Sequence, residues 1–152
     1  MGMAIYNSPV GPLYIEEADG AISELRFSSD KTEDTQKSPL MERCFAQLDA
    51  YFAGTLREFD LPLAPKGTEF QMRAWKALCE IPYGVTWSYK DLAEHIGSPR
   101  GYRAVGLANN RNPISIFIPC HRVIGASGRL TGYGGGLDTK EFLLNLEGVT
   151  AK

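Results

Sequence analysis

The spacing of apolar residues in the first 64 positions predicts several strands and one helix. Segments 10–15 and 21–27 are rich in apolar side chains and flank Asp19-Gly20, a dipeptide typical of hairpin turns. Between Pro39 and Phe52 the apolar residues recur at helical spacing. Segment 59–63 predicts a short strand at a sheet edge, because Pro62 has no N–H to donate.

The pattern becomes helical after a connecting segment at 64–67. Thr68 and Gln71 fit a capping box that begins a helix, and the apolar face of this helix extends to Ile81. A second helical pattern covers 88–97, and a third follows the turn at 98–99, from position 100 to about 110. This order is typical of a helix-turn-helix, although two plain antiparallel helices give the same pattern. We therefore expect a mixed α/β protein with an α/β domain at 1–64 and a mostly helical domain at 65–152.

Composition limits the class of protein. The chain has 152 residues, of which 43% are hydrophobic and 22% charged, as in ordinary soluble domains. No apolar stretch approaches the roughly 20 residues that span a bilayer, and the first residues lack the pattern of a signal peptide. The three cysteines are far apart, so neither a disulfide framework nor a zinc cluster is predicted. We expect a reducing cytosol.

Charge is divided unevenly along the chain. Residues 1–65 hold five Lys and Arg against eleven Asp and Glu, whereas residues 66–152 hold eleven against seven. A basic second half indicates a polyanionic partner for that half. Charge alone does not distinguish a polyanionic partner from a chance distribution of charged residues.

The strongest chemical signal is Cys120 followed by His121, directly after the apolar run 114–118. A thiol is a poor nucleophile until a neighbouring base takes its proton, and an imidazole can be that base. The pair alone is compatible with hydrolysis, redox chemistry or metal binding.

The order and spacing of short blocks from Gly67 to Gly148 resemble the O6-alkylguanine-DNA alkyltransferases. The blocks are Phe70-Gln71, Trp75–Leu78, Tyr83-Gly84, Ser88-Tyr89, Arg103–Gly106, Asn112-Pro113, Ile118–Val123, Gly132-Tyr133, Gly135–Leu137, Lys140-Glu141, Leu143-Leu144 and Glu147-Gly148. The resemblance implies an RNase H-like α/β first domain and a winged helix-turn-helix second domain.

The resemblance also implies the chemistry. Cys120 is expected to accept the alkyl group, His121 to act as its base through a water, and Glu147 to orient the imidazole. Asn112 is expected to help position Cys120. A thioether does not hydrolyse, so the protein is expected to act once, without a cofactor or a metal.

The target atom lies inside duplex DNA, so the resemblance implies that the base is flipped out from the minor groove. Arg103 is expected to enter the stack in its place, and Tyr89 to crowd the target phosphate. The other candidate DNA contacts are Arg100, Tyr102, Asn109 and Arg111. We expect a monomer bound to double-stranded DNA, with no membrane partner and a cytoplasmic location.

Four groups are expected around the flipped base. The backbone carbonyls of Cys120 and Val123 face its exocyclic amine, while Tyr133 and the N–H of Gly134 close over it. Several relatives have Ser in place of Gly134, which affects only fine substrate preference.

Simpler roles are expected for other reactive side chains. Cys44 and Cys79 lie on apolar helix faces and are expected in the core. His95 is expected at the surface, and Arg122 to form an ion pair beneath the turn that carries Cys120 rather than to contact DNA.

Three other functions are compatible with parts of the pattern. They are a damage-binding protein without an acceptor cysteine, a helix-turn-helix regulator and a hydrolytic cysteine enzyme. Cys120 argues against the first, and the lack of clustered cysteines argues against the second.

Overall fold

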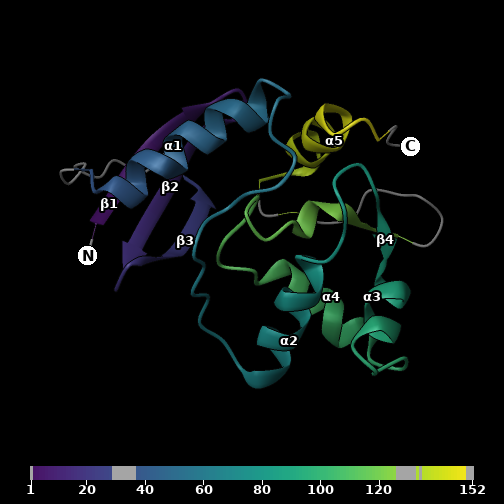
Figure 1. The fold of residues 1–152 in the computed structure, drawn as a ribbon. Coiled ribbons are helices and arrows are strands. Elements are labelled where there is room, and N and C mark those ends of the chain that lie inside the picture. Colours follow the sequence, from purple (N-terminus) through teal and green to yellow (C-terminus); the bar gives the residue numbers. More distant parts are fainter. Residues whose placement is uncertain (1, 29–36, 126–132, 134, 150–152) are drawn as a thin grey trace.

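Three antiparallel strands form the sheet of the first lobe, in the order β1–β2–β3 (Figure 1). They are β1 (Gly2–Ser8), β2 (Gly11–Ala18) and β3 (Ala21–Phe27). This computed structural model describes residues 2–28, 37–125, 133 and 135–149. The hairpin predicted at Asp19-Gly20 is confirmed. Strand β1 was not predicted, because Tyr6 is the one large side chain among its buried positions, the others being Gly2 and Ala4.

Helix α1 (Pro39–Phe52) packs on this sheet, as its apolar spacing predicts. Ser38 caps it by accepting a hydrogen bond from the Met41 N–H, and Pro39 at the first position has no N–H that needs a partner. The buried side of α1 includes Cys44, which confirms its predicted place in the core, and Tyr51 near the end of the helix.

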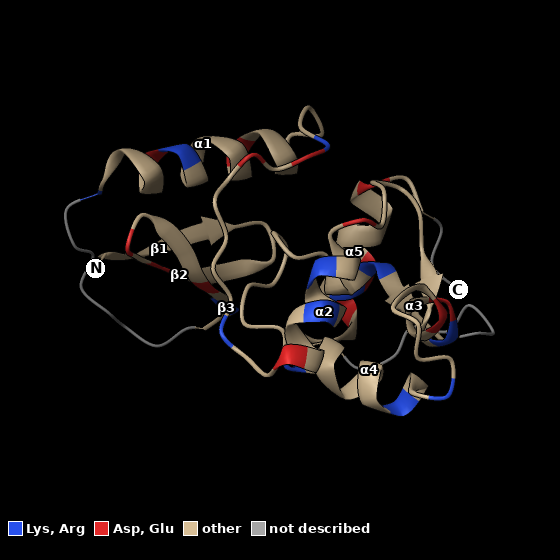
Figure 2. Cartoon of the chain, turned by 60° about the horizontal axis from the view of Figure 1, so that its bottom comes forward, with Lys and Arg blue, Asp and Glu red and all other residues tan. Residues whose placement is uncertain are grey.

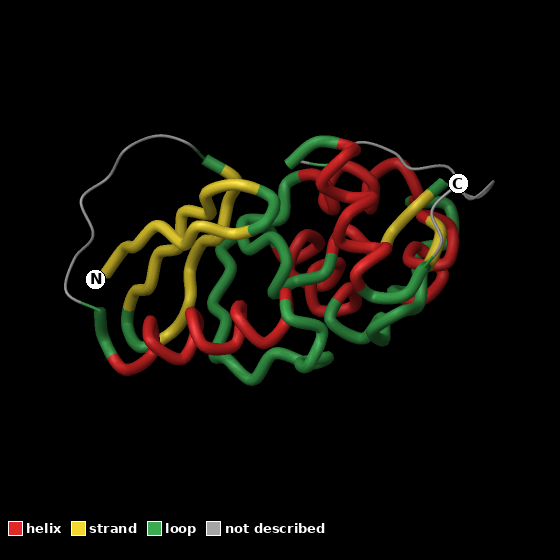
Figure 3. Tube along the Cα trace, turned by 90° about the horizontal axis from the view of Figure 1, so that it is seen from above, coloured by secondary structure: helices red, strands yellow, loops and turns green. Residues whose placement is uncertain are grey.

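The second lobe is mostly helical and lies beside the first (Figure 3). Its helices are α2 (Glu69–Leu78), α3 (Tyr89–His95), α4 (Tyr102–Asn110) and α5 (Leu137–Leu146). The short strands β4 (Trp87–Ser88) and β5 (Val123–Ile124) pair in parallel. The capping box of Thr68 and Gln71 is present, and Ser88 with Asp91 forms a second one at α3. Helices α3 and α4 pack together as the predicted helix-turn-helix. With the sheet of the first lobe, this confirms the predicted mixed α/β fold.

Three predictions about helices and strands are wrong. Helix α2 ends at Leu78, so Cys79 lies at its C-cap and is exposed instead of continuing the buried face. Segment 59–63 is not a strand, because only its end pairs with the sheet, through a single bridge between Leu63 and Ile22. The third helix begins at Tyr102, two residues later than predicted.

The edge of β3 joins the two lobes. The Leu25 N–H donates to the Pro113 carbonyl (2.9 Å), and the Ser115 N–H donates to the Leu25 carbonyl (3.0 Å). The same strand also binds the chain just before α2: the Ile22 N–H donates to the Pro62 carbonyl (2.8 Å), and the Ala64 N–H donates to the Ile22 carbonyl (2.8 Å). The first lobe therefore holds the start of the loop that leads to Cys120. Within the described part of the chain, no helix is long and apolar enough to cross a membrane.

Candidate active site

Cys120 begins a single 3₁₀ turn, η1 (Cys120–Arg122), at the end of the loop after α4. The loop is tight: the Cys120 N–H donates to the Ile118 carbonyl (2.7 Å), and the Ile118 N–H donates to the Ile114 carbonyl (3.0 Å). Ile116 has a φ of 72°, a left-handed conformation that strains a β-branched residue. The Cys120 side chain is buried. The fold therefore holds this thiol on a constrained turn.

His121 and Glu147 form a buried pair, with 2.7 Å between Nε2 and Oε2. Glu147 is the C-cap of α5, 26 residues later in the chain. Because a carboxylate only accepts hydrogen bonds, Nε2 carries the proton of the neutral imidazole and Nδ1 keeps its lone pair. Nδ1 has no protein partner within the described residues. It can therefore accept a proton from a nucleophile or a water.

Arg122 holds the Glu147 carboxylate on both oxygens. Its Nε lies 2.7 Å from Oε1 and its Nη2 lies 3.1 Å from Oε2, while Nη1 donates to the Ile81 carbonyl. This bidentate geometry is strong and directional. The predicted ion pair beneath the turn is thereby confirmed for Arg122.

The pKa values in this cluster follow from burial and from these partners. Burial raises the pKa of the Cys120 thiol, while hydrogen bonding by Asn112, the charge of Lys140 and hydrogen bonding by Ser115 act against that increase. Burial lowers the pKa of His121, so its resting form is neutral. Burial alone would raise the pKa of Glu147, but His121 and Arg122 outweigh it and lower that pKa to about 2. The resting site is a neutral thiol beside a neutral base and a fixed carboxylate.

Two asparagines, one in the last turn of α4 and one just after it, brace the turn that carries Cys120. Asn112 donates from Nδ2 to the Ile118 carbonyl (2.9 Å) and accepts from the Ile114 N–H (2.9 Å). Asn109 is buried and its Nδ2 lies 3.4 Å from the Cys120 carbonyl. The expectation that Asn109 contacts DNA from the helix surface is corrected here, because the side chain faces inward.

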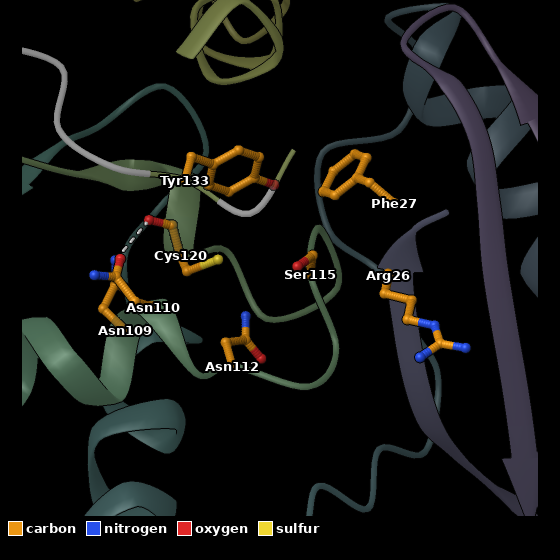
Figure 4. A pocket seen from close by; sticks show the side chains of 8 residues that line it. All are labelled: Arg26, Phe27, Asn109, Asn110, Asn112, Ser115, Cys120 and Tyr133. Carbon is orange, nitrogen blue, oxygen red and sulfur yellow. Dashed lines mark hydrogen bonds between the residues drawn. The ribbon is translucent and has the colours of Figure 1, made fainter. Parts of the chain in front are cut away.

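A cavity of about 140 Å³ opens beside the Cys120 sulfur (Figure 4). Its lining is mixed polar and aromatic, and comes from both lobes: Arg26, Phe27, Asn109, Asn110, Asn112, Ser115, Cys120 and Tyr133. Figure 4 shows the sulfur, Ser115 and Asn112 around one space, with the rings of Tyr133 and Phe27 above it. This space can admit a small group to the thiol.

The first lobe contributes Arg26 and Phe27 to that cavity, although its sequence suggested no chemistry. The Phe27 ring meets the Tyr133 ring edge-on, with centroids 5.5 Å apart. It also leaves no room for a side chain at Gly135, where a Cβ would lie 2.9 Å from Phe27 Cδ2. No local pattern indicates this role, because it depends on how β3 docks against the second lobe.

Lys140 is a further residue of the site whose role sequence reasoning missed. Its side chain is fully buried, and Nζ donates to the Val123 carbonyl over 2.6 Å. Burial lowers the pKa of Lys140 to about 8, and a negative charge on Cys120 opposes that decrease. The signal was available: Lys140, Leu143, Leu144 and Glu147 share one face of α5, where a lysine is out of place unless it has a function.

The residues expected to surround a bound base are only partly described. Val123 is buried with its carbonyl already accepting from Lys140, which leaves one lone pair for a ligand. Tyr133 lines the cavity. Gly134 lies outside the described residues.

The expected DNA-contacting residues lie on α3, α4 and the turn between them. Arg100, Tyr102, Arg103 and Arg111 are exposed, and Tyr89 is half-buried at the start of α3. Figure 2 shows basic residues at one end of α4 and on the turn between α3 and α4. Helix α4 approaches α3 closely at Gly106, where a Cβ would lie 3.5 Å from the Tyr89 ring. The described residues therefore include both a group of exposed arginines on and beside α4 and the buried thiol of Cys120.

His95 is exposed, as predicted, and pairs with Glu80 (3.2 Å) at the surface.

Two family models match the chain. Residues 69–149 match the DNA binding domain of 6-O-methylguanine DNA methyltransferase, and residues 1–65 match its ribonuclease-like domain. Known proteins agree with these matches. A methylated-DNA–protein-cysteine methyltransferase of Methanosarcina barkeri is 54% identical over 149 residues, which cover 94% of each chain.

Solved structures of similar proteins have the same fold. The O6-methylguanine methyltransferase of Mycobacterium tuberculosis superposes with a TM-score of 0.87 at 49% identity, over 95% of this chain and 91% of the other. A structure of the M. tuberculosis OGT in complex with DNA gives a TM-score of 0.85 at 51% identity, over 94% and 90%.

Proposed function

The chain belongs to the 6-O-methylguanine DNA methyltransferase family, and from this premise we propose that it repairs DNA by moving the alkyl group of O6-alkylguanine to the sulfur of Cys120. The observation that carries the proposal is the buried pair of His121 and Glu147 beside a thiol that faces a cavity. The pair supplies a base with a free Nδ1 next to the nucleophile.

The reaction follows from these groups. His121 Nδ1 takes the Cys120 proton through one water, and the thiolate attacks the alkyl carbon. The carbon–O6 bond breaks as the carbon–sulfur bond forms, and its electron pair remains on the guanine, whose N1 receives the proton. Glu147 holds Nε2 and stabilises the transient imidazolium. The thioether cannot be hydrolysed under these conditions, so each molecule reacts once.

DNA binding is assigned to the face of α3 and α4. Arg103 fills the place of the extruded base, and Tyr89 pushes the target nucleotide toward the cavity. Arg100, Tyr102 and Arg111 contact the backbone of the minor groove. Arg100, Arg103 and Arg111 are all exposed, which supports this role, since cationic side chains bind phosphates by releasing counterions.

We assign residues 1–64 and 65–152 to separate domains of a monomer. Its three cysteines are all free, which fits a reducing cytoplasm.

Intact-protein mass spectrometry tests the function directly. After incubation with duplex DNA containing O6-methylguanine, the protein should gain one methyl group, mapped to Cys120 and absent in Cys120→Ser. Cys79→Ser is the matched control, because Cys79 is exposed and does not line the cavity beside Cys120, and this variant should still gain the group. Repair of many lesions per protein, or repair with no change in mass, would refute the proposal in favour of a hydrolytic enzyme.

A further inference from the structure

Tyr51 connects the first lobe to the carboxylate of the active site. It lies near the C-terminal end of α1, which approaches α5 in Figure 1, and its side chain is fully buried. Its hydroxyl lies 2.6 Å from Glu147 Oε2, across 96 residues of sequence. Oε2 is the same oxygen that accepts the hydrogen bond from His121.

The direction of this hydrogen bond is fixed by chemistry. Burial, followed by the charge of Glu147, raises the pKa of Tyr51 far above its usual value, so the phenol keeps its proton. Glu147 is ionised and can only accept. Tyr51 therefore donates, and it shares one carboxylate oxygen with the imidazole.

We propose that Tyr51 is a positioning residue for alkyl transfer, which holds Glu147 Oε2 in the place from which it orients His121. This inference rests on the proposed function. Arg122 anchors the carboxylate mainly through Oε1, with a longer contact to Oε2. The Tyr51 hydroxyl is thus the closest donor to Oε2 among the described contacts of Glu147.

Because Tyr51 and His121 share Glu147 Oε2, the Tyr51 hydroxyl also affects the basicity of the His121 imidazole. A donor on Oε2 withdraws charge from the bond to His121, so removal of the hydroxyl should strengthen that bond and raise the pKa of His121. The other groups around His121 are Arg122 and Lys140, whose charges lower its pKa, and Cys120 and Tyr133 in the adjacent cavity. None of them is altered when only the Tyr51 hydroxyl is removed.

Tyr51→Phe tests the inference, because it removes one oxygen and keeps the ring. That ring packs against Phe59 and Phe52 with centroids 5.1 and 5.3 Å apart, contacts that phenylalanine retains. Tyr6→Phe is the matched control. Tyr6 is also buried and donates to Asp49 of α1 over 2.5 Å, but its hydroxyl does not contact Glu147.

The measurement is the single-turnover rate of methyl transfer as a function of pH, with duplex DNA and with free O6-benzylguanine. We expect Tyr51→Phe to lower the maximal rate about tenfold, as loss of an orienting partner does. The acid limb should move up by about 0.5 pH unit, the size expected for one hydrogen bond. Both effects should occur with both substrates, because the pair of His121 and Glu147 acts on either one.

The controls separate the possible outcomes. Tyr6→Phe should keep the wild-type rate and pH midpoint, whatever its melting temperature. Equal profiles for Tyr51→Phe and the wild type, or equal changes in both variants, would overturn the positioning role. A defect confined to duplex DNA would also overturn it. If the wild type itself transfers no methyl group, the proposed function fails instead.

Discussion

Lys140 donates a hydrogen bond to the Val123 carbonyl over 2.6 Å, with both residues fully buried. A buried ammonium is costly unless it has partners or a task. Its charge lowers the pKa of Cys120 against the effect of burial. This relationship brings the only lysine on the buried face of α5 into the chemistry of the site.

Replacing Lys140 should therefore weaken the nucleophile. We expect Lys140→Met to raise the pKa of Cys120 by about one unit, which lowers the thiolate fraction roughly tenfold at neutral pH. The rate of alkylation by iodoacetamide as a function of pH measures this pKa. Lys90→Met, which changes an exposed lysine of α3, should leave it unchanged. An unaltered profile in Lys140→Met would contradict the electrostatic role.

Phe27 should limit the size of the transferred group. It lines the cavity and contacts Tyr133, so a smaller side chain there should make room beside the thiol. We expect Phe27→Leu to raise the rate of benzyl transfer relative to methyl transfer by at least about tenfold, the lower end of the effect of a small change in pocket size. Phe45→Leu is the control, because Phe45 packs on Tyr6 instead. The same shift in both variants would contradict a specific role of Phe27.

Glu147 should make the protein sensitive to acid. Its pKa is about 2 in the folded state, against a usual value of 4.5. A lowered pKa stabilises the fold above pH 4.5, and this stabilisation is lost as the pH falls toward 2. The loss amounts to about 3 kcal/mol. Urea unfolding at several pH values should show it in the wild type.

The variant Glu147→Gln provides the comparison. It cannot titrate, so its free energy of unfolding should change less over the same pH range. It should also be less stable at pH 7, by about 3 to 5 kcal/mol, because Arg122 remains buried without its partner. Identical pH dependence in the two proteins would show that other carboxylates are responsible.

Arg103 should matter for DNA and not for the chemical step. Arg103→Ala should slow repair of duplex DNA about a hundredfold, which corresponds to the few kcal/mol needed to unstack a base. Reaction with free O6-benzylguanine should stay near the wild-type rate. Lys76→Ala, on the exposed side of α2, should affect neither reaction. Equal losses on both substrates would exclude the insertion of Arg103 into the stack.

Binding to DNA should also weaken as salt increases, because each phosphate contact releases a counterion. Fluorescence anisotropy at several salt concentrations gives the slope. Arg100→Ala and Arg111→Ala, which remove proposed phosphate contacts, should each reduce it by about one. A flat response in the wild type would contradict the assignment of α3 and α4 as the docking face.

The sequence predicted the elements whose signals are local. The cap at Thr68 and the hairpin at Asp19-Gly20 depend on a few neighbouring residues, and the structure has both. Strand β1 escaped prediction because two of its three buried positions are Gly2 and Ala4, and Tyr6 alone gives no alternating apolar pattern. Cys79 was misplaced because apolar spacing does not show where a helix ends.

The site was predictable only in part, for a similar reason. Cys120 and His121 are adjacent in the chain, so their motif can be recognised directly from the sequence. Tyr51 and Phe27 reach the site only through tertiary contacts, and a tyrosine on an apolar helix face looks like any other core residue. Asn109 was assigned to the surface because helical position alone does not show which side of α4 meets the Cys120 turn.

The pairing of β3 with the loop before Cys120 has a consequence for protein engineering. A chimera that joins residues 65–152 to an unrelated N-terminal domain would lose the edge of β3, which forms backbone hydrogen bonds with Pro113 and Ser115. It would also lose the hydroxyl of Tyr51 and the ring of Phe27. A replacement for the first domain must therefore provide a strand edge like that of β3, a tyrosine at the position of Tyr51 and an aromatic ring at the position of Phe27.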